Sequence, residues 1–390
     1  MTLRILHLIT GLGTGGAEHM LEKLAGGMDR AQFSSAVISL TGEGAVGPRL
    51  RRSGIPVHAL GIRGWQDVPG ALLTLRRLVD DIQPDILQTW LYHADLVGTL
   101  VHWLARSPAA LAWNLRCSDM NLADYALSTR LVLRAVVAIS ARPAFVVTNS
   151  EAGRRHHAAL GYKPRRWVDI PNGFDTSLFR PRPEASSALR AELGIPERTP
   201  VVGMVARLDP MKDHDTFVAM AGILAARHPE MRFVLVGRGC TAAAPLLAAA
   251  QRRLEGRLHL LGERQDIPML LAGMDVGVLT SAYGEGFPNV LGEALATGLP
   301  CVATDVGDAA AILGDCGIVV PPRDAAALAA GVETLLARGD AERSAAQQRA
   351  RRRAEENFSL QAAIRCYESV YSEAAPARQV AANFPRVPST

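Results

Sequence analysis

The sequence has 390 residues, of which 48% are hydrophobic and 21% are charged, and its net charge is +4. This length favours two domains, and the apolar content is sufficient for a core in each of them. The five cysteines are scattered without a Cys-x-x-Cys pair, no apolar run reaches about eighteen residues, and no basic run is interleaved with aromatic residues. A disulfide framework, a zinc site, a membrane-spanning helix and nucleic acid binding are therefore not expected. A signal peptide is not expected either, because Met1 leads directly into a strand-like segment.

Short apolar segments alternate with amphipathic segments through the first half of the chain. The pattern predicts strands at 3–10, 33–40, 56–60, 85–90, 110–114, 144–149 and 167–170, which is typical of a doubly wound parallel sheet. The first strand leads into Gly11-Leu-Gly13-Thr-Gly15-Gly16, which formally contains the dinucleotide-binding pattern Gly-x-Gly-x-x-Gly. The second strand does not end in the acidic residue that would hold a ribose, so the match is poor. A ligand-binding loop and a plain tight turn both remain open for Gly15 and Gly16.

Polar residues follow the fourth and fifth predicted strands. His93 and Asp95 come after strand 85–90, and Arg116 comes after strand 110–114. Open α/β sheets bind ligands at the carboxyl ends of their strands, so these side chains are candidates for a site. His93 is a candidate for polarising reacting groups, and capping or packing is an equally ordinary role for one histidine. Arg116 ranks after it, as a candidate for contact with a phosphate or an acceptor.

The positive charge is concentrated in the first part of the chain. Residues 1–172 carry 19 basic and 13 acidic residues, a net charge of +6, which leaves −2 for the remainder. Such a surface is compatible with contact to an anionic membrane, and equally with ordinary solvated arginines on helix faces.

A turn and a proline-rich segment separate this first series of strands from a second one. Asn172-Gly173 is a turn signal, and Arg180-Pro-Arg-Pro183 follows it. Beyond them, strands are predicted at 200–206, 232–237, 257–262, 275–280, 300–304 and 317–320. The chain therefore contains two doubly wound units with a boundary near residue 172.

Two cations follow the first strand of the second series. Arg207 lies at the tip of that strand and Lys212 precedes the next helix, so both should reach the crevice at the strand ends. The chain has only three lysines, which favours a specific role for Lys212. Asp213 and Asp215 match the Asp-x-Asp of metal-dependent sugar transferases of another fold, but their place before an apolar segment favours a helix cap. No metal is expected.

The stretch 273–305 predicts a strand, a glycine-bearing loop at 281–287, a helix at 288–298 and another strand. Glycines in the loop let the backbone approach a ligand, and free amides at the helix N-terminus favour an anion. The residues expected to contact that anion are Gly286, Phe287, Asn289 and Val290. Glu285 and Glu293 frame this position, and because carboxylates would be repelled by phosphate they should accept hydrogen bonds from hydroxyls. A ligand with both phosphate and hydroxyl groups is a sugar nucleotide.

The two glutamates stand in Glu285-Gly-Phe-Pro-Asn-Val-Leu-Gly-Glu293, which resembles the signature of the retaining glycosyltransferases of family four, the group 1 glycosyl transferases. The resemblance extends over about residues 1–375. It implies the GT-B fold, in which two Rossmann-like α/β domains with doubly wound parallel sheets face a cleft. It also implies that Glu285 contacts the donor sugar, that Glu293 binds the ribose, and that Arg207 and Lys212 hold the diphosphate.

The resemblance implies roles for other loops as well. The Gly15-Gly16 loop would abut the donor from across the cleft, with His93 near the donor sugar. The loops that contain Gly239 and Arg264 would flank the nucleotide base.

We therefore expect a metal-independent, retaining hexosyltransferase that moves a sugar from a UDP- or GDP-sugar to an acceptor hydroxyl, with no cofactor. The expected domains are residues 1–172 for the acceptor and 173–357 for the nucleotide sugar, with helix 358–374 packing back on the first domain and a disordered tail at 375–390. The acceptor would be a saccharide or lipid-linked saccharide in bacterial polysaccharide or glycolipid assembly, in the cytoplasm or at the inner membrane face. A sugar-nucleotide epimerase of the same fold and a dinucleotide-binding oxidoreductase remain alternatives.

Overall fold

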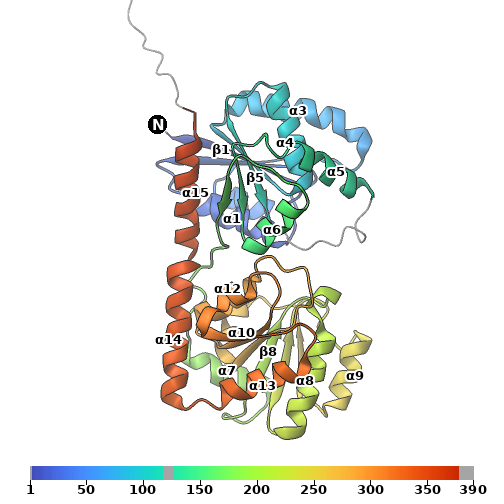
Figure 1. The fold of residues 1–390 in the computed structure, drawn as a ribbon, viewed down its shortest axis with the longest axis vertical. Coiled ribbons are helices and arrows are strands. Elements are labelled where there is room, and N and C mark those ends of the chain that lie inside the picture. The colour runs from blue at the N-terminus through green and yellow to red at the C-terminus, as the bar shows by residue number, and fades with distance from the viewer. Residues whose placement is uncertain (1, 117–126, 377–390) are drawn as a thin grey trace, which may run out of the picture.

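The computed structural model describes residues 2–116 and 127–376, which form two α/β units stacked along the long axis of the molecule (Figure 1). The unit nearer the N-terminus contains a parallel sheet with the strand order β3-β2-β1-β4-β5-β6-β7. Its elements are β1 (Leu3–Ile9), α1 (Gly16–Gly27), β2 (Phe33–Ser39), α2 (Gly47–Arg52), β3 (Val57–Ala59), η1 (Trp65–Asp67), α3 (Val68–Ile82), β4 (Ile86–Trp90), α4 (Tyr92–Leu104), β5 (Ala110–Leu115), α5 (Leu127–Ala138), β6 (Phe145–Thr148), α6 (Glu151–Ala159) and β7 (Trp167–Asp169).

The second unit contains a parallel sheet with the order β10-β9-β8-β11-β12-β13, which is the doubly wound order 3-2-1-4-5-6. Its elements are α7 (Pro183–Leu193), β8 (Val201–Val205), η3 (Pro210–Lys212), α8 (His214–Arg227), β9 (Arg232–Val236), α9 (Pro245–Arg253), β10 (Leu258–Gly262), α10 (Ile267–Gly273), β11 (Val276–Leu279), α11 (Asn289–Thr297), β12 (Cys301–Thr304), α12 (Ala309–Leu313), η4 (Gly314–Cys316), β13 (Gly317–Val320), α13 (Ala325–Leu336) and α14 (Asp340–Asn357). Its central strands are buried on both faces because helices cover the sheet on each side, which explains their nearly continuous apolar sequences.

The last helix, α15 (Leu360–Ala374), returns to the first unit and runs along its sheet (Figure 1). Tyr367 and Tyr371 are fully buried there, in one apolar cluster with side chains of α1 and β1. Their hydroxyls are satisfied inside the core, where Asn114 donates to Tyr367 at 2.9 Å and Tyr371 donates to Gln88 at 3.1 Å. The helix is therefore a structural part of the first unit.

The chain crosses between the units at two neighbouring places. Phe174 follows the first unit and pairs its backbone with the crossing between α14 and α15, through hydrogen bonds of 2.8 Å to Phe358 and from Leu360. The Phe174 ring stacks on Phe287 with centroids 6.0 Å apart, and Phe358 meets the edge of Phe287 at 5.6 Å. Phe287 is part of the loop that precedes α11, so this aromatic cluster holds one end of that loop.

The predicted fold class is confirmed, and every predicted strand is present with its ends within one residue of the expected positions. The helix predicted at 288–298 is present as α11 (Asn289–Thr297), with Pro288 as its N-cap at a ψ of 97°. Gly298 ends that helix as expected, in the left-handed conformation with a φ of 76°. Of the predicted tail, residues 377–390 lie outside the described residues.

Candidate active site

A cleft with a volume of about 540 Å³ lies between the two units, at the carboxyl ends of their strands. The first unit and the linker contribute Gly16, Ala17, Glu18, Leu91, Arg116, Asn149 and Asn172. The second unit contributes Val205, Arg207, Met211, Lys212, Gly284, Glu285, Gly286, Phe287, Asn289, Val290 and Glu293. The cleft thus brings together most of the site residues predicted from the sequence. They come from segments as far apart as Gly16 and Glu293, almost 300 residues.

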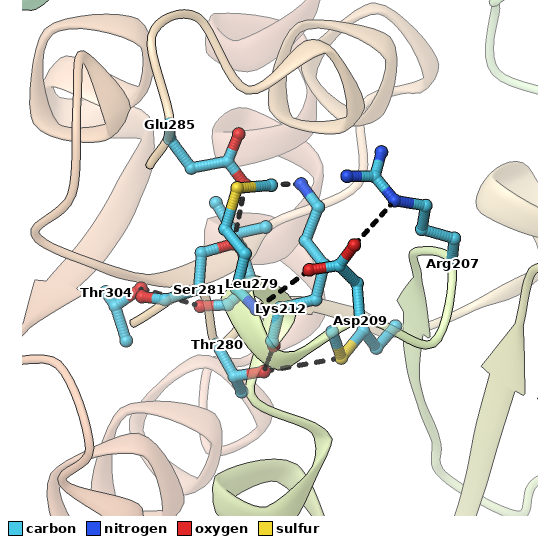
Figure 2. A network of polar contacts seen from close by, with 10 residues as sticks. Arg207, Asp209, Lys212, Leu279, Thr280, Ser281, Glu285 and Thr304 are labelled. Atoms are coloured by element: carbon cyan, nitrogen blue, oxygen red, sulfur yellow. Dashed lines mark hydrogen bonds and ion pairs between the residues drawn. The ribbon is translucent and has the colours of Figure 1, made fainter. Parts of the chain in front are cut away.

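Two cations project into the cleft from the loop after β8 (Figure 2). Lys212 forms an ion pair with Glu285, and their side chains are only 14% and 8% exposed. Ser281 fixes the same carboxylate oxygen through a 2.6 Å hydrogen bond. Arg207 is half exposed and donates from Nε to Asp209 at 3.0 Å. The Lys212 ammonium is therefore positioned by a buried network, whereas the Arg207 guanidinium keeps free donors toward the solvent side.

Asp209, in the loop after β8, links Arg207 to the backbone next to Lys212, because its carboxylate accepts from Arg207 and from the Met211 amide. Burial raises the pKa of its carboxyl, but the Met211 amide, Arg207 and nearby Lys212 together hold it below its ordinary value. The carboxylate also begins the short helix η3 by accepting from the Met211 amide at 3.0 Å. It stays charged near neutral pH and so keeps Arg207 oriented.

The loop before α11 presents backbone to the cleft. Gly284 has a φ of +77°, which only glycine adopts without strain, and a β-carbon there would lie 2.7 Å from the sulfur of Met211. The Phe287 side chain is 8% exposed and belongs to the aromatic cluster, so the cleft meets this residue mainly through its backbone. Asn289 faces Gly16 across the cleft, because a β-carbon on Gly16 would lie 3.6 Å from the Asn289 amide nitrogen. The N-terminus of α11 is thus open toward an anion.

Glu293 lines both this cleft and a second hollow of about 370 Å³. Burial raises the pKa of Glu293 to about 7, and the charge of Lys23 opposes that rise. Arg264 lines the second hollow, where Asp266 and Glu192 bind its guanidinium and raise its pKa. Glu293 is thus shared by the linings of two neighbouring hollows, one with Lys212 and Arg207 and the other with Arg264.

Three of the predicted residues line neither the cleft nor the second hollow. Gly15 is the N-cap of α1, next to Gly16. Gly239 has a φ of +85° and supports the Arg207 loop, because a β-carbon there would lie 2.9 Å from Leu208. His93 is in the first turn of α4, partly buried, and burial lowers its pKa. The roles of these residues toward a ligand stay predictions.

The first unit contributes a polar network whose partners the sequence did not indicate. Arg116 extends into the cleft, stacks over Trp90 at 5.1 Å, and donates to Asn172 and to the Tyr367 hydroxyl. Asn172 in turn donates to Asn289 at 2.7 Å, so a chain of hydrogen bonds leads from α15 to the N-terminus of α11. Position at a strand end was the available signal for Arg116, and nothing in the sequence indicated the partner on α15.

The Asp-x-Asp motif is used for capping. Asp213 has a φ of 48° and begins α8, where its carboxylate accepts from the amide and hydroxyl of Thr216 at 3.2 and 2.6 Å. Within the described ranges, the structure contains no cluster of three or more His, Cys, Asp or Glu side chains arranged to hold a metal ion.

Two family models match this chain, one in each of the two units. Residues 15–173 match the family model for a glycosyl transferase 4-like domain, and residues 199–338 match the model for glycosyl transferases group 1. The chain belongs to the group 1 glycosyltransferases. Its two-sheet architecture is that of the GT-B fold, as in its structural neighbours.

One solved structure covers nearly the whole glycosyltransferase chain, and curated relatives cover shorter parts of it. HepE of Anabaena, solved in complex with UDP, is 25% identical, with a TM-score of 0.82 over 95% of this chain and 100% of the other. The EpsF protein of Bacillus subtilis, a putative glycosyltransferase, is 27% identical over 77% of this chain and 79% of its own length. An Escherichia coli UDP-Gal:alpha-D-GlcNAc-diphosphoundecaprenol alpha-1,3-galactosyltransferase is 36% identical over a shorter stretch, 37% of this chain and 38% of its own.

Proposed function

We propose that this glycosyltransferase moves a sugar from a nucleoside-diphosphate sugar to an acceptor hydroxyl, with retention of configuration and without a metal ion. The observation that carries the proposal is the convergence of Lys212, Arg207 and the open N-terminus of α11 in one cleft opposite Gly16. Three sources of positive potential at one place suit a diphosphate, whose charge increases as the glycosidic bond breaks. The binding of UDP by HepE, which shares this fold over its whole length, supports the same class of donor here.

The reaction would proceed on one face of the donor sugar. The bond from the anomeric carbon to the diphosphate oxygen breaks, the acceptor oxygen forms the new bond, and its proton passes to the departing phosphate oxygen. Lys212, Arg207 and the free amides of the 287–290 segment, those of Phe287, Asn289 and Val290, hold the charge of the leaving group. Glu285 is engaged by Lys212 and Ser281, which suits hydrogen bonding to the donor sugar better than nucleophilic attack. Glu293, which lines both hollows, would accept from the ribose hydroxyls, with the base in the Arg264 hollow.

The proposed activity is tested by incubating the protein with single UDP- and GDP-sugars and a panel of saccharide and lipid-linked acceptors. NMR of the product should show the anomeric configuration of the donor. An epimerase would convert the donor without any acceptor. A dinucleotide-binding oxidoreductase would instead bind NAD, and neither activity requires a saccharide acceptor.

We further propose that the acceptor is presented at a membrane, in polysaccharide or glycolipid assembly on the cytoplasmic side. Five large apolar side chains are exposed on the α4–α5 face, defined by Leu100, Trp103, Leu104, Leu127 and Leu131. This face lies on the side of the first unit away from α15 (Figure 1). No helix within residues 2–116 and 127–376 combines the length and apolar character needed to span a bilayer.

The charge around the α4–α5 face suits anionic lipids. Residues 96–115 and 127–144 contain four arginines and no acidic residue, while Asp119 and Asp124 lie between them, outside the described residues. Exposed tryptophan and leucine beside arginine is the composition of interfacial membrane contacts.

Sedimentation with phosphatidylglycerol vesicles, compared with phosphatidylcholine vesicles, tests this contact. Leu131→Ser should weaken the sedimentation, because Leu131 is 55% exposed on the α4–α5 face. Leu178→Ser is the matched control, since Leu178 is 48% exposed in the segment before α7, outside the α4–α5 face. Equal sedimentation of both variants and the wild type would refute the contact.

A further inference from the structure

One carboxylate of the second unit caps a helix of the first. Asp308 lies in the turn between β12 and α12, and its side chain accepts from the amides of Glu151 at 2.8 Å and Ala152 at 2.9 Å. These are the first two amides of α6, and Ser150 accepts from the third, on Gly153, at 3.0 Å. Figure 1 shows α6 and α12 facing one another across the boundary between the units. A carboxylate at a helix N-terminus is stabilised both by these hydrogen bonds and by the helix dipole.

The same turn is fastened to the loop that faces the donor. The Asp308 amide donates to the Gly286 carbonyl at 3.0 Å. Gly307, with a φ of +62°, packs so closely that a β-carbon would collide with the carbonyl of Glu285. The turn therefore cannot move far without moving Glu285 and Gly286, which line the cleft.

We propose that Asp308 is a positioning residue that couples donor binding to closure of the two units. The proposal rests on the proposed function only in assigning the cleft to a nucleoside-diphosphate sugar. A diphosphate at the α11 N-terminus orders the 284–287 loop, the loop orders the 306–308 turn, and the turn presents its carboxylate to α6. Because linkage is reciprocal, loss of the α6 contact weakens binding of the diphosphate by the same factor by which the diphosphate strengthens that contact.

The test removes the contact from each side separately. Asp308→Ala deletes the acceptor, and Asp308→Asn keeps one carbonyl oxygen for an α6 amide. Glu151→Pro deletes one donor, and it suits the helix because proline is favoured at the first helical position and the preceding Ser150 is extended, with a φ of −154° and a ψ of 147°. Asp305→Ala is the control, since Asp305 is an exposed acid three residues before Asp308.

We expect UDP binding, measured by calorimetry, to weaken about fivefold in Asp308→Ala, the factor that corresponds to a typical lost helix cap. Asp308→Asn should recover most of the affinity, Asp305→Ala should match the wild type, and the Asp308→Ala/Glu151→Pro double variant should be no weaker than Asp308→Ala alone. Small-angle X-ray scattering without nucleotide should give a larger radius of gyration for Asp308→Ala and for Glu151→Pro.

Each contrary result has a definite meaning. UDP affinity unchanged in Asp308→Ala, with only a lower melting temperature, would reduce Asp308 to a structural cap and overturn the proposal. Weaker binding in Asp308→Ala but not in Glu151→Pro would also overturn it, because the effect would then arise within the donor loop. A wild type that binds no UDP or GDP would count against the proposed function, and the scattering measurement would still decide whether Asp308 holds the units together.

Discussion

Replacement of Lys212 by methionine tests the chemical role of the cleft most directly, because methionine keeps most of the volume and removes the ammonium. A charged donor aimed at a developing anion typically contributes a factor of about 10²–10³ in rate, or roughly 3–4 kcal/mol. We expect Lys212→Met to lose kcat by that order and to bind UDP more weakly. Lys212→Arg should recover only part of the rate, since a planar guanidinium does not fit the place of a compact ammonium against Glu285 and Ser281.

The structure also predicts an effect on folding. A lysine at the edge of a crevice suggests little contribution to stability, but the Lys212 and Glu285 side chains are 14% and 8% exposed. Breaking a buried ion pair from one side costs about 3–5 kcal/mol, and we expect about 3 kcal/mol because Ser281 still donates to the carboxylate. For a domain of this size that is a fall of roughly 6–12 °C in melting temperature.

The double variant Lys212→Met/Glu285→Gln separates the two effects. Neutralising Glu285 removes the uncompensated buried charge, so the double variant should regain most of the stability while turnover stays low. Initial rates at saturating donor, UDP titration and thermal unfolding provide the three measurements. Near-normal turnover and UDP affinity in Lys212→Met, together with a lower melting temperature, would show that Lys212 is a structural charge and would refute the mechanism.

Four further outcomes are expected. Glu285→Gln should mainly lower kcat, because the donor sugar changes shape during the reaction, and small, equal effects in Glu285→Gln and Glu293→Gln would show that the motif was misread. Glu293→Gln should mainly raise the donor KM. The wild-type KM should also rise as the pH falls below about 7, because Glu293 then becomes protonated and accepts hydrogen bonds less well. The KM of the variant should show no such rise. The free energy of unfolding should depend on pH in the opposite direction to donor binding. Because the pKa of Glu293 in the folded protein exceeds the ordinary 4.5, the wild type loses stability relative to Glu293→Gln as the pH rises from about 4.5 to 7. Urea unfolding at several pH values would detect this loss. Transfer should survive excess EDTA, and activity lost on chelation and restored by Mg²⁺ or Mn²⁺ would reassign Asp213 and Asp215 as metal ligands.

The sequence by itself determined the architecture and the local elements that position the site. Buried parallel strands have continuous apolar sequences, so their positions can be predicted from the sequence alone. Caps are equally local, which is why Asp213 before α8 and Gly298 after α11 were predictable. The carboxyl ends of parallel strands meet at one edge, and this rule was sufficient to place Arg207, Lys212 and Glu285 together.

Only the tertiary structure decided which of these side chains are partners. The Lys212–Glu285 pair joins residues 73 apart in the sequence, and the Arg116–Tyr367 contact joins residues 251 apart. Neither contact can therefore be predicted from a local sequence pattern. The sequence also could not show that Arg264 is engaged by Glu192, or that Asp308 caps a helix of the other unit. Side-chain direction depends on how helices pack and on where the two units meet. Those are properties of the assembled core, whereas strand and cap signals are contained in a few consecutive residues.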